Sequence, residues 1–244
     1  LVEVGSRSRT MEFERKMKMM MKGKGGLFTL SLLLFTSAAT AAELPAGYRQ
    51  VEYIESTKGG NQYIDTEYTA NANTRVEMDA YLPPVEKQND DSVVLFGTRS
   101  TPDESKGIDW STKAFSIQLL NMNRIRFAYN GEYVESPYNQ SFGERMTITC
   151  DSKQLAWTGR DPGTASVTVP PLEYSKSTLY IFSDNSVSED GGKYDGAFNA
   201  SVMKLFSFKI YEGETLVRDF VPFKTANGKV CGLYDLAKGD LYFN

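Results

Sequence analysis

Apolar and polar residues alternate with a period of two along most of the chain beyond residue 48. Such alternation is typical of strands that bury one face and leave the other in water. Gly, Pro, Asn and Asp separate the alternating runs, and no run has the period of a helix. The pattern predicts strands at 50–55, 74–82, 93–98, 114–120, 124–129, 145–150, 154–158, 179–183, 202–211 and 216–221.

Two short segments predict how neighbouring strands are joined. Asn130-Gly131 is the strongest hairpin signal, because Asn and Gly tolerate the positive φ of a type I′ turn. Residues 151–153 have the composition of a longer hairpin loop. Many short strands joined in this way predict an all-β fold, a two-sheet antiparallel β-sandwich. In the run at 74–82 we expect an inward face of Val76, Met78, Ala80 and Leu82 and an outward face of Glu77, Asp79 and Tyr81.

Residues 1–41 read as an upstream extension followed by a secretory signal peptide. Lysines precede an apolar run at 27–35, and small residues at 39–41 provide a cleavage site. The apolar run is shorter than the ~20 residues that span a bilayer, so we expect no permanent membrane anchor. The sequence thus predicts a single domain at 42–244 that is secreted, periplasmic or displayed at the cell surface.

The charge of the predicted domain argues against nucleic acid as a partner. The chain has 27 Lys and Arg and 31 Asp and Glu, a formal charge of −4. Seven of the basic residues and three of the acidic ones precede residue 42, which leaves a net charge near −8 beyond it. Such a surface, without a basic stripe, repels a phosphate backbone.

Cys150 and Cys231 are the two cysteines of the chain, which contains no histidine. In an oxidising compartment the two thiols either form a disulfide or stay reduced as two separate small apolar side chains. The sequence does not decide between these two states. The lack of histidine excludes Ser-His-Asp and Cys-His nucleophiles and the usual zinc sites. Only hard oxygen ligands remain available for a metal.

Residues 147–159 have the pattern of a hairpin with a turn at Asp151 and a glycine at its end, and 195–199 lead into a run that ends in Tyr211. Short alternating motifs stand near both ends of the chain, at 48–56, 62–65, 206–211, 216–220 and 232–235. Together these motifs resemble the concanavalin A-like lectin/glucanase superfamily, and within it the laminin-G-like jelly rolls of secreted and surface bacterial proteins. The resemblance implies a jelly roll in which the first and last strands lie together.

Some members of this superfamily are glucanases with Glu-x-Asp-x-x-Glu, or Glu-x-Asp-x-Glu, along one strand. Glu77 and Asp79 match the first half, but Leu82 or Tyr81 stands where the second glutamate is required. Because hydrolysis with retention needs two carboxyl groups roughly 5–5.5 Å apart, we expect Glu77 and Asp79 to be solvated strand residues. A glycoside hydrolase that uses them with a distant third carboxylate stays the alternative.

Two polar stretches, 99–112 and 184–196, are predicted to be surface loops that carry the binding function. Trp110 offers an aromatic face for a sugar, whereas Trp157 shares strand parity with Leu155 and is expected to pack in the core or at an edge. Tyr129, Tyr133 and Tyr138 either pave a surface or simply reflect the preference of tyrosine for strands, and we favour the second reading. The expected ligand-binding residues are Arg99, Asp109, Trp110, Asp184, Asn185 and Tyr194.

Acidic residues crowd the same stretches. Asp103, Glu104 and Asp109 are candidate Ca²⁺ ligands, with solvated loop carboxylates as the other reading. Taken together, the sequence predicts a secreted, non-catalytic carbohydrate-binding or adhesion module of the laminin-G-like type. Its expected partner is an extracellular glycan or polysaccharide, or a surface protein. A further alternative is a structural or protein-binding module of a cell-surface or phage-tail-like assembly.

Overall fold

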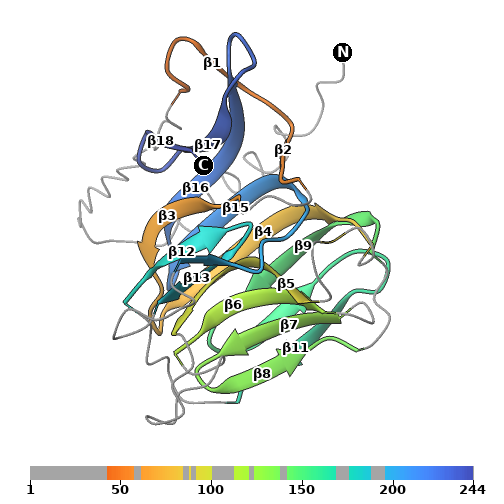
Figure 1. Cartoon of the computed structure of the whole chain (residues 1–244). Coiled ribbons are helices and arrows are strands. Elements are labelled where there is room, and N and C mark those ends of the chain that lie inside the picture. Colours follow the sequence, from red (N-terminus) through yellow and green to blue (C-terminus); the bar gives the residue numbers. More distant parts are fainter. Residues whose placement is uncertain are drawn as a thin grey trace, which may run out of the picture. The chain divides into compact units, whose positions relative to one another are not determined.

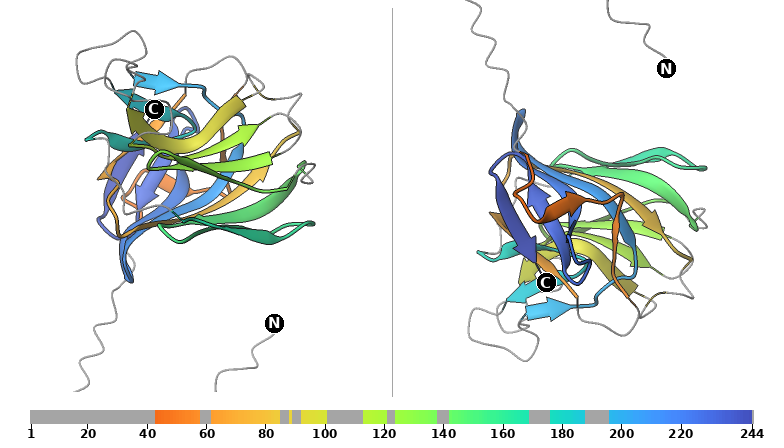
Figure 2. Two further views of the ribbon diagram at one scale, coloured as in Figure 1. Left: turned by 90° about the horizontal axis from the view of Figure 1, so that it is seen from below. Right: turned by 90° about the horizontal axis from the view of Figure 1, so that it is seen from above.

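The structure, a computed structural model, describes residues 43–57, 62–84, 88, 92–100, 113–120, 124–137, 142–168, 176–187 and 196–243. The chain divides into two compact units between Thr40 and Ala41, and all described residues belong to the second. These residues form strands and turns, and no helix among them is long and apolar enough to cross a membrane. The strands make two sheets packed as a sandwich, which confirms the predicted all-β fold (Figures 1 and 2).

The larger sheet, called sheet A, has the strand order β11-β10-β9-β4-β15-β16-β17-β18, with β1 paired to β16 and β2 to β15. All its pairs are antiparallel. Its strands are β1 (Tyr48–Gln50), β2 (Ile54–Glu55), β4 (Thr74–Leu82), β9 (Glu144–Cys150), β10 (Gln154–Trp157), β11 (Gly163–Ser166), β15 (Lys204–Glu212), β16 (Thr215–Thr225), β17 (Cys231–Asp235) and β18 (Asp240–Phe243).

The second sheet, called sheet B, has the order β14-β13-β5-β6-β7-β8, and β12 pairs with both β3 and β5. Its pairs are antiparallel except β5 with β13, which run parallel. Its strands are β3 (Ile64–Thr69), β5 (Ser92–Ser100), β6 (Phe115–Leu120), β7 (Arg124–Tyr129), β8 (Glu132–Glu135), β12 (Thr178–Ile181), β13 (Asp184–Val187) and β14 (Gly196–Phe198).

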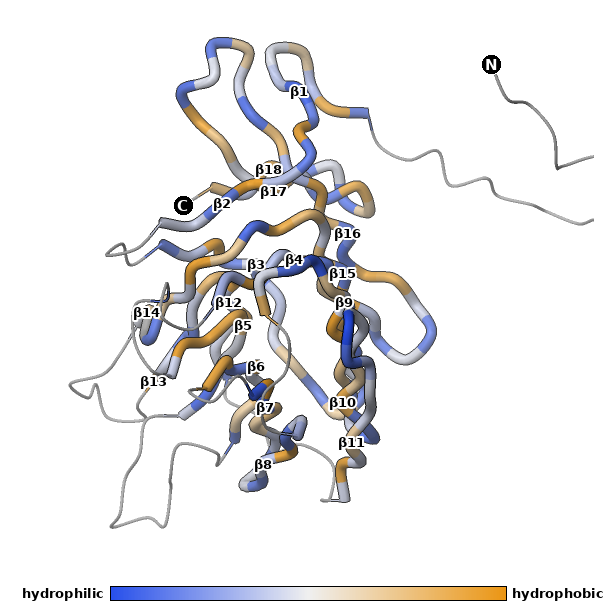
Figure 3. The backbone as a smooth tube through the Cα atoms, turned by 90° about the vertical axis from the view of Figure 1, so that its right-hand side faces the viewer, coloured by the Kyte–Doolittle hydropathy of each residue, from blue (hydrophilic) through white to orange (hydrophobic). Residues whose placement is uncertain are grey.

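The core lies between the two sheets, as the alternating pattern requires. In β4 the predicted inward residues Val76, Met78, Ala80 and Leu82 are all fully buried. Phe96 of β5 reaches across to Phe208 of β15, with ring centroids 5.0 Å apart in an edge-to-face contact. Each large apolar side chain buried in this way contributes about 1.5–3 kcal/mol. Figure 3 shows β5 to β8 on one side and β9 to β11 on the other.

The first and last strands lie together, as predicted. Tyr48 of β1 is opposite Thr225 of β16, and Ile54 of β2 is opposite Leu205 of β15. The single strand expected at 50–55 is therefore two short strands, because its two ends pair with different neighbours. In Figure 1 β1 runs beside the projecting part of β16 and β17.

The two predicted hairpin turns are present. Asn130 and Gly131, between β7 and β8, have φ values of 46° and 89°, as a type I′ turn requires. In the turn after β9, Asp151 Oδ1 accepts hydrogen bonds from the backbone N–H groups of Lys153 at 2.7 Å and Gln154 at 3.0 Å. These turns fix the register of both hairpins.

A disulfide between the two cysteines, left open by the sequence, is not formed, and both thiols are free. Cys150 ends β9 and is fully buried, whereas Cys231 begins β17 and is exposed. The strands β4, β15 and β16 lie between them in sheet A. Four strand spacings of about 4.8 Å place the two residues at least about 19 Å apart, far beyond the ~7 Å that a disulfide bridges.

Candidate functional site

The predicted ligand-binding residues divide into two groups. Arg99, Asp184 and Asn185 are described by the structure, whereas Asp109, Trp110 and Tyr194 lie outside the described residues. The Ca²⁺ candidates Asp103, Glu104 and Asp109 lie outside them too. Among the residues that are described, no three His, Cys, Asp or Glu side chains gather closely enough to hold a metal ion.

Arg99 and Asp184 form a buried ion pair. They lie on the parallel strands β5 and β13, where Asp184 is opposite Gly97. Arg99 Nε is 2.7 Å from Asp184 Oδ2, and the two side chains are 5% and 0% exposed. The prediction that Arg99 and Asp184 lie in exposed surface loops is therefore wrong. The polar sequence of β13 resembles a loop, but its backbone pairs with both β5 and β14.

Gly97 lets the Asp184 carboxylate approach the sheet. A Cβ atom at this position would lie 2.2 Å from Ser116 Cβ and 2.8 Å from Asp184 Oδ1. Neither oxygen of Asp184 accepts a hydrogen bond from the described residues, and among those residues its polar partner is Arg99. Burial raises the pKa of Asp184 from 3.8 to about 6, although Arg99 acts in the opposite direction. The carboxyl group therefore changes its protonation near pH 6.

Asn185 does not share this environment, because successive strand residues face opposite sides of a sheet. Its Nδ2 donates to the carbonyl of Thr178 at 2.9 Å. On the same side, Thr98 Oγ1 lies 2.5 Å from Ser177 Oγ. Asn185 thus fastens β13 to β12, and its role is structural.

A row of paired residues crosses sheet B on the face that points away from the core. It runs Tyr180, Gly97, Ser116, Ala128 and Tyr133 over β12, β5, β6, β7 and β8. The middle of the row is small, and Ser116 and Ala128 are fully buried. Tyr133, at the end of the row on edge strand β8, is 41% exposed. Among the described residues of this row, the accessible end is therefore the β7–β8 hairpin.

Tyr133 is held by charged neighbours from the same hairpin. The guanidinium carbon of Arg126 lies 4.3 Å from the centre of the Tyr133 ring. Arg126 Nε donates to Glu135 Oε1 at 2.5 Å, and Arg124 Nη1 pairs with Glu135 Oε2. We call Arg124, Arg126, Tyr133 and Glu135 the Tyr133 platform. It presents an exposed aromatic ring and fixed polar groups on one surface.

The sequence contained a signal for this platform. A two-residue turn at Asn130-Gly131 places Arg126 opposite Glu135 and Ala128 opposite Tyr133, as the structure has them. Because tyrosine prefers strands, Tyr129, Tyr133 and Tyr138 were interpreted as ordinary strand residues. Tyr129 and Tyr133 both lie in strands, β7 and β8, and are 1% and 41% exposed, whereas Tyr138 lies outside the described residues.

Glu77 and Asp79 face outward from sheet A, as predicted. Glu77 pairs with Arg75 and accepts a hydrogen bond from Tyr211 Oη at 3.2 Å. Asp79 receives two hydrogen bonds from Arg145, Nε to Oδ1 at 2.8 Å and Nη2 to Oδ2 at 2.7 Å. Each carboxylate is therefore held by an arginine.

The strands beside β4 supply no carboxylate partner to either residue. Residues directly opposite on neighbouring strands are the ones a catalytic pair would use, since their Cβ atoms lie about 4.5–5.5 Å apart. Glu77 is flanked by Thr149 and Lys209, and Asp79 by Thr147 and Ser207. Trp157, expected in the core or at an edge, is 5% exposed, and its Nε1 donates to the carbonyl of Asp161 at 2.8 Å.

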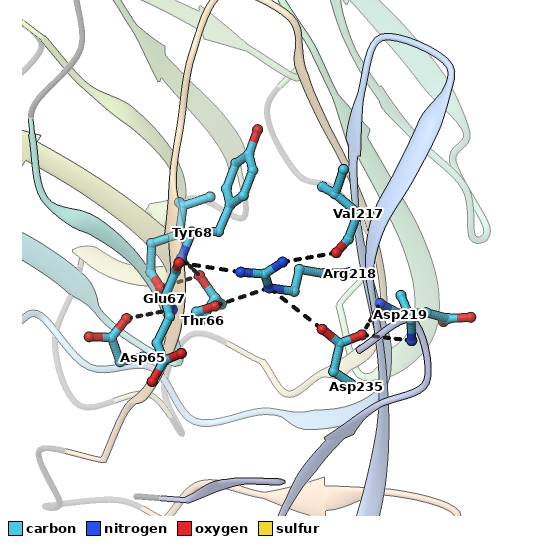
Figure 4. A network of polar contacts seen from close by, with 10 residues as sticks. Asp65, Thr66, Glu67, Tyr68, Val217, Arg218, Asp219 and Asp235 are labelled. Atoms are coloured by element: carbon cyan, nitrogen blue, oxygen red, sulfur yellow. Dashed lines mark hydrogen bonds and ion pairs between the residues drawn. The ribbon is translucent and has the colours of Figure 1, made fainter. Parts of the chain in front are cut away.

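A second buried ion pair, Arg218 with Asp235, joins the terminal motifs (Figure 4). Arg218 Nε is 3.5 Å from Asp235 Oδ2, and the side chains are 6% and 0% exposed. Arg218 also donates to three backbone carbonyls, those of Thr66, Glu67 and Val217, at 3.3, 3.3 and 2.9 Å. Because Thr66 and Glu67 belong to β3, the arginine ties sheet B to β16 and β17 of sheet A.

The second oxygen of the Asp235 carboxylate, Oδ1, is held by backbone groups. Its Oδ1 accepts hydrogen bonds from the backbone N–H groups of Asp219 and Ala237, both at 2.9 Å. Tyr68, next to this network, bonds to Thr74 Oγ1 at 2.9 Å, and burial raises the pKa of Tyr68 to about 12. This region has the connections of a structural link between the sheets.

No family model matches the chain, and no match was found among curated proteins. Among solved structures the chain is similar to the mouse laminin alpha1 chain, domains LG4-5, at 12% identity and a TM-score of 0.39. The match covers 80% of this chain and 48% of that one, so the chain spans about half the length of the laminin structure. The two-sheet architecture is established by the strand pairing of the chain itself.

Proposed function

We propose that this protein is a secreted, non-catalytic module of the laminin-G-like type that binds carbohydrate or adheres to a surface through the outer face of sheet B. The observation that carries the proposal is the Tyr133 platform. Its ring is 41% exposed although it is large and apolar, and Arg126, itself fixed by Glu135, packs against it. Exposed aromatic rings beside fixed polar groups are typical of ligand sites.

The platform suits a sugar because a pyranose has one apolar side and a rim of hydroxyl groups. The tyrosine ring offers a flat contact for the apolar side, at a low entropy cost since its position is already fixed. Among the described residues Arg126 donates a hydrogen bond through Nε alone, which leaves its terminal amino groups as donors for hydroxyl oxygens. A glycan or polysaccharide on an extracellular surface is the expected partner.

The spacing of carboxylates on this face favours binding over hydrolysis. Glu135 is held by two arginines, and Asp184 lies four strand positions away in the order β13-β5-β6-β7-β8. At about 4.8 Å per strand the two are about 19 Å apart, whereas glycosidases need roughly 5–9.5 Å. Glu77 and Asp79 lie on the other sheet, each paired with an arginine.

The test is a glycan and polysaccharide array probed with the full chain, with Ca²⁺ and again with a chelator. We expect saturable binding that Tyr133→Ala weakens about tenfold or more, as truncation of a central aromatic contact does. Tyr53→Ala is the matched control, because Tyr53 is 36% exposed but lies beside sheet A. Loss of binding with chelator would identify a Ca²⁺ requirement. Silence on every glycan, or equal effects of the two substitutions, would refute the proposal.

A further inference from the structure

A shallow pocket of 380 Å³ lies on the outer face of sheet A. It is formed where β9, β10 and β11 lie side by side (Figure 3). We call it the threonine pocket, because its outward-facing lining is Thr147, Thr149, Ala156, Thr158, Pro162 and Thr164. Trp157 and Gly163 complete the lining.

The sheet register arranges these hydroxyl groups as a small grid. Thr149, Ala156 and Thr164 are directly opposite one another on three adjacent strands. Thr147 lies two residues before Thr149, and its backbone N–H donates to Thr158 Oγ1 at 2.8 Å. Strand geometry separates the threonines by about 7 Å along a strand and about 10 Å across two strand spacings. The grid therefore covers an area that suits one or two sugar rings.

Most of these hydroxyls are available to a ligand. Within the described part of the chain, the hydroxyl groups of Thr147, Thr149 and Thr164 make no hydrogen bond. Each can donate one hydrogen bond and accept others. The threonine methyl groups, Ala156 and Pro162 lie between them, so the pocket combines apolar contact with hydroxyl recognition, as ligand sites generally do.

One glycine permits close packing behind the pocket. Trp157 and Gly163 are opposite each other on β10 and β11. A Cβ atom at Gly163 would lie 2.5 Å from Trp157 Cζ2, so only glycine permits the indole ring to lie there. The indole is also held by the hydrogen bond from Nε1 to the carbonyl of Asp161.

The charges around the pocket decide the class of ligand. No charged side chain is among its described lining residues. The nearest carboxylates across β4 are Glu77 and Asp79, opposite Thr149 and Thr147, and each is neutralised by an arginine. Arg145, two residues before Thr147 on β9, is engaged by Asp79 through two hydrogen bonds. A charged ligand would therefore lose hydration without gaining a free counter-ion, which is costly. A neutral, hydroxyl-rich ligand has no such penalty.

We propose that the threonine pocket is a second sugar-binding site, on the face of the sandwich opposite the Tyr133 platform, and that it takes a neutral hexose residue. The proposal goes beyond the function proposed above, since it needs neither the platform nor the same ligand. Together the two sites would let one domain contact a polysaccharide at two points.

The experiment is an amide NMR titration of the full, ¹⁵N-labelled chain. The probes are methyl β-glucoside, methyl α-mannoside and methyl β-galactoside, with methyl β-glucuronide as the charged counterpart. We expect saturable shifts in residues 147–149 and 156–164 with at least one neutral glycoside and weaker ones with the glucuronide. Affinity in the millimolar range, about 1 mM, is expected for so shallow a site.

Two variants separate recognition from structure. Thr149→Val combined with Thr164→Val keeps the methyl groups and removes two hydroxyls, and should weaken binding about tenfold. Ala156→Gln leaves every hydroxyl in place and fills the pocket, and should also weaken binding. Thr215→Val is the matched control, because Thr215 is an exposed residue of sheet A outside the pocket.

Each outcome separates this site from the Tyr133 platform. Binding that the threonine variants weaken and Tyr133→Ala does not supports the pocket, whatever the platform does. Absence of shifts with all neutral glycosides, preference for the glucuronide, or equal binding by the Thr149/Thr164 double variant overturns it. If only Tyr133→Ala reduces glycan binding, the function proposed above stands and the second site does not.

Discussion

The two buried arginine–aspartate pairs of this protein resemble each other in composition and differ in their surroundings. Asp235 accepts two backbone hydrogen bonds at Oδ1. Its Oδ2 accepts none from the described residues but lies 3.5 Å from Arg218, which itself donates to three carbonyls. Asp184 has Arg99 at 2.7 Å but no hydrogen bond from the described residues. A buried ion pair contributes to stability only when the remaining polar atoms of both groups are satisfied.

The difference indicates which pair serves the fold. The Arg218–Asp235 pair joins β3 of one sheet to β16 and β17 of the other, with most of its bonds to backbone, which is suited to holding a sandwich closed. The Arg99–Asp184 pair lies on one sheet, beneath the outward face that ends in the Tyr133 platform. Its incompletely satisfied carboxyl costs stability, and such a cost is typical of a functional region.

The largest expected effect is that of Asp235→Ala. The substitution leaves Arg218 buried without its counter-ion and removes the acceptor of two backbone N–H groups. We expect a loss of about 3–5 kcal/mol in the free energy of unfolding, measured by urea denaturation. Asp240→Ala is the control, since Asp240 is exposed on the neighbouring strand β18. Equal stability of the two variants would mean that the pair does not hold the sheets together.

Asp184 should make stability depend on pH in the direction opposite to that of an ordinary aspartate. Its pKa is about 6 in the folded protein against 3.8 normally, so the folded state binds more protons between these values. Its contribution is therefore full below pH 4 and is lost as the pH rises through 6. The difference of about two pKa units corresponds to about 3 kcal/mol.

The measurement is the unfolding free energy of the protein and of Asp184→Asn from pH 4 to pH 7. Asparagine keeps the shape of the side chain but does not titrate. We expect the stability of the unsubstituted protein, relative to Asp184→Asn, to fall by about 3 kcal/mol across this range. Asp240→Asn should give a curve parallel to the unsubstituted protein. A constant difference between the protein and Asp184→Asn would contradict a buried, titrating carboxyl.

The bounds of a strand could be predicted where one of its faces is apolar and the other is polar. The strand predicted at 74–82 has these bounds in the structure, as does the one at 124–129. The reason is physical: β4 buries Val76, Met78, Ala80 and Leu82 while its other face carries charges, so the period of two is visible. The Asn130-Gly131 turn likewise depends only on local backbone chemistry.

The exposure of a polar stretch could not be predicted where its burial depends on tertiary contacts. The stretch 184–187 was expected to be part of a loop, yet Asp184, Asn185 and Ser186 are buried in a strand between β5 and β14. Arg99 and Asp184 were identified as site residues, but as exposed ones. A polar side chain that pairs with a residue 85 positions away has no local signature, so periodicity cannot detect it.

Gly97→Ala tests whether close packing sets the Asp184 site. The new methyl group would meet Ser116 Cβ and Asp184 Oδ1, and we expect a loss of about 1–3 kcal/mol in the free energy of unfolding. In a Ser116→Gly background the loss should become smaller but not vanish, because the contact with the carboxylate remains. Identical losses in both backgrounds, measured by urea denaturation, would show that Ser116 does not limit the site.

The smallest effect is expected for Arg145→Ala, which removes an ion pair on the outer face of sheet A. The Arg145 side chain is 51% exposed, and the Asp79 side chain 26%. Hydrogen bonding to Asp79 raises the pKa of Arg145, but water and salt screen so exposed a pair, which limits its contribution to about 0–1 kcal/mol. Urea denaturation should therefore give a small cost in low salt and a still smaller one in high salt. A loss as large as that of Asp235→Ala would mean that exposure does not distinguish the ion pairs of this protein, and the contrast between its surface and buried pairs would fail.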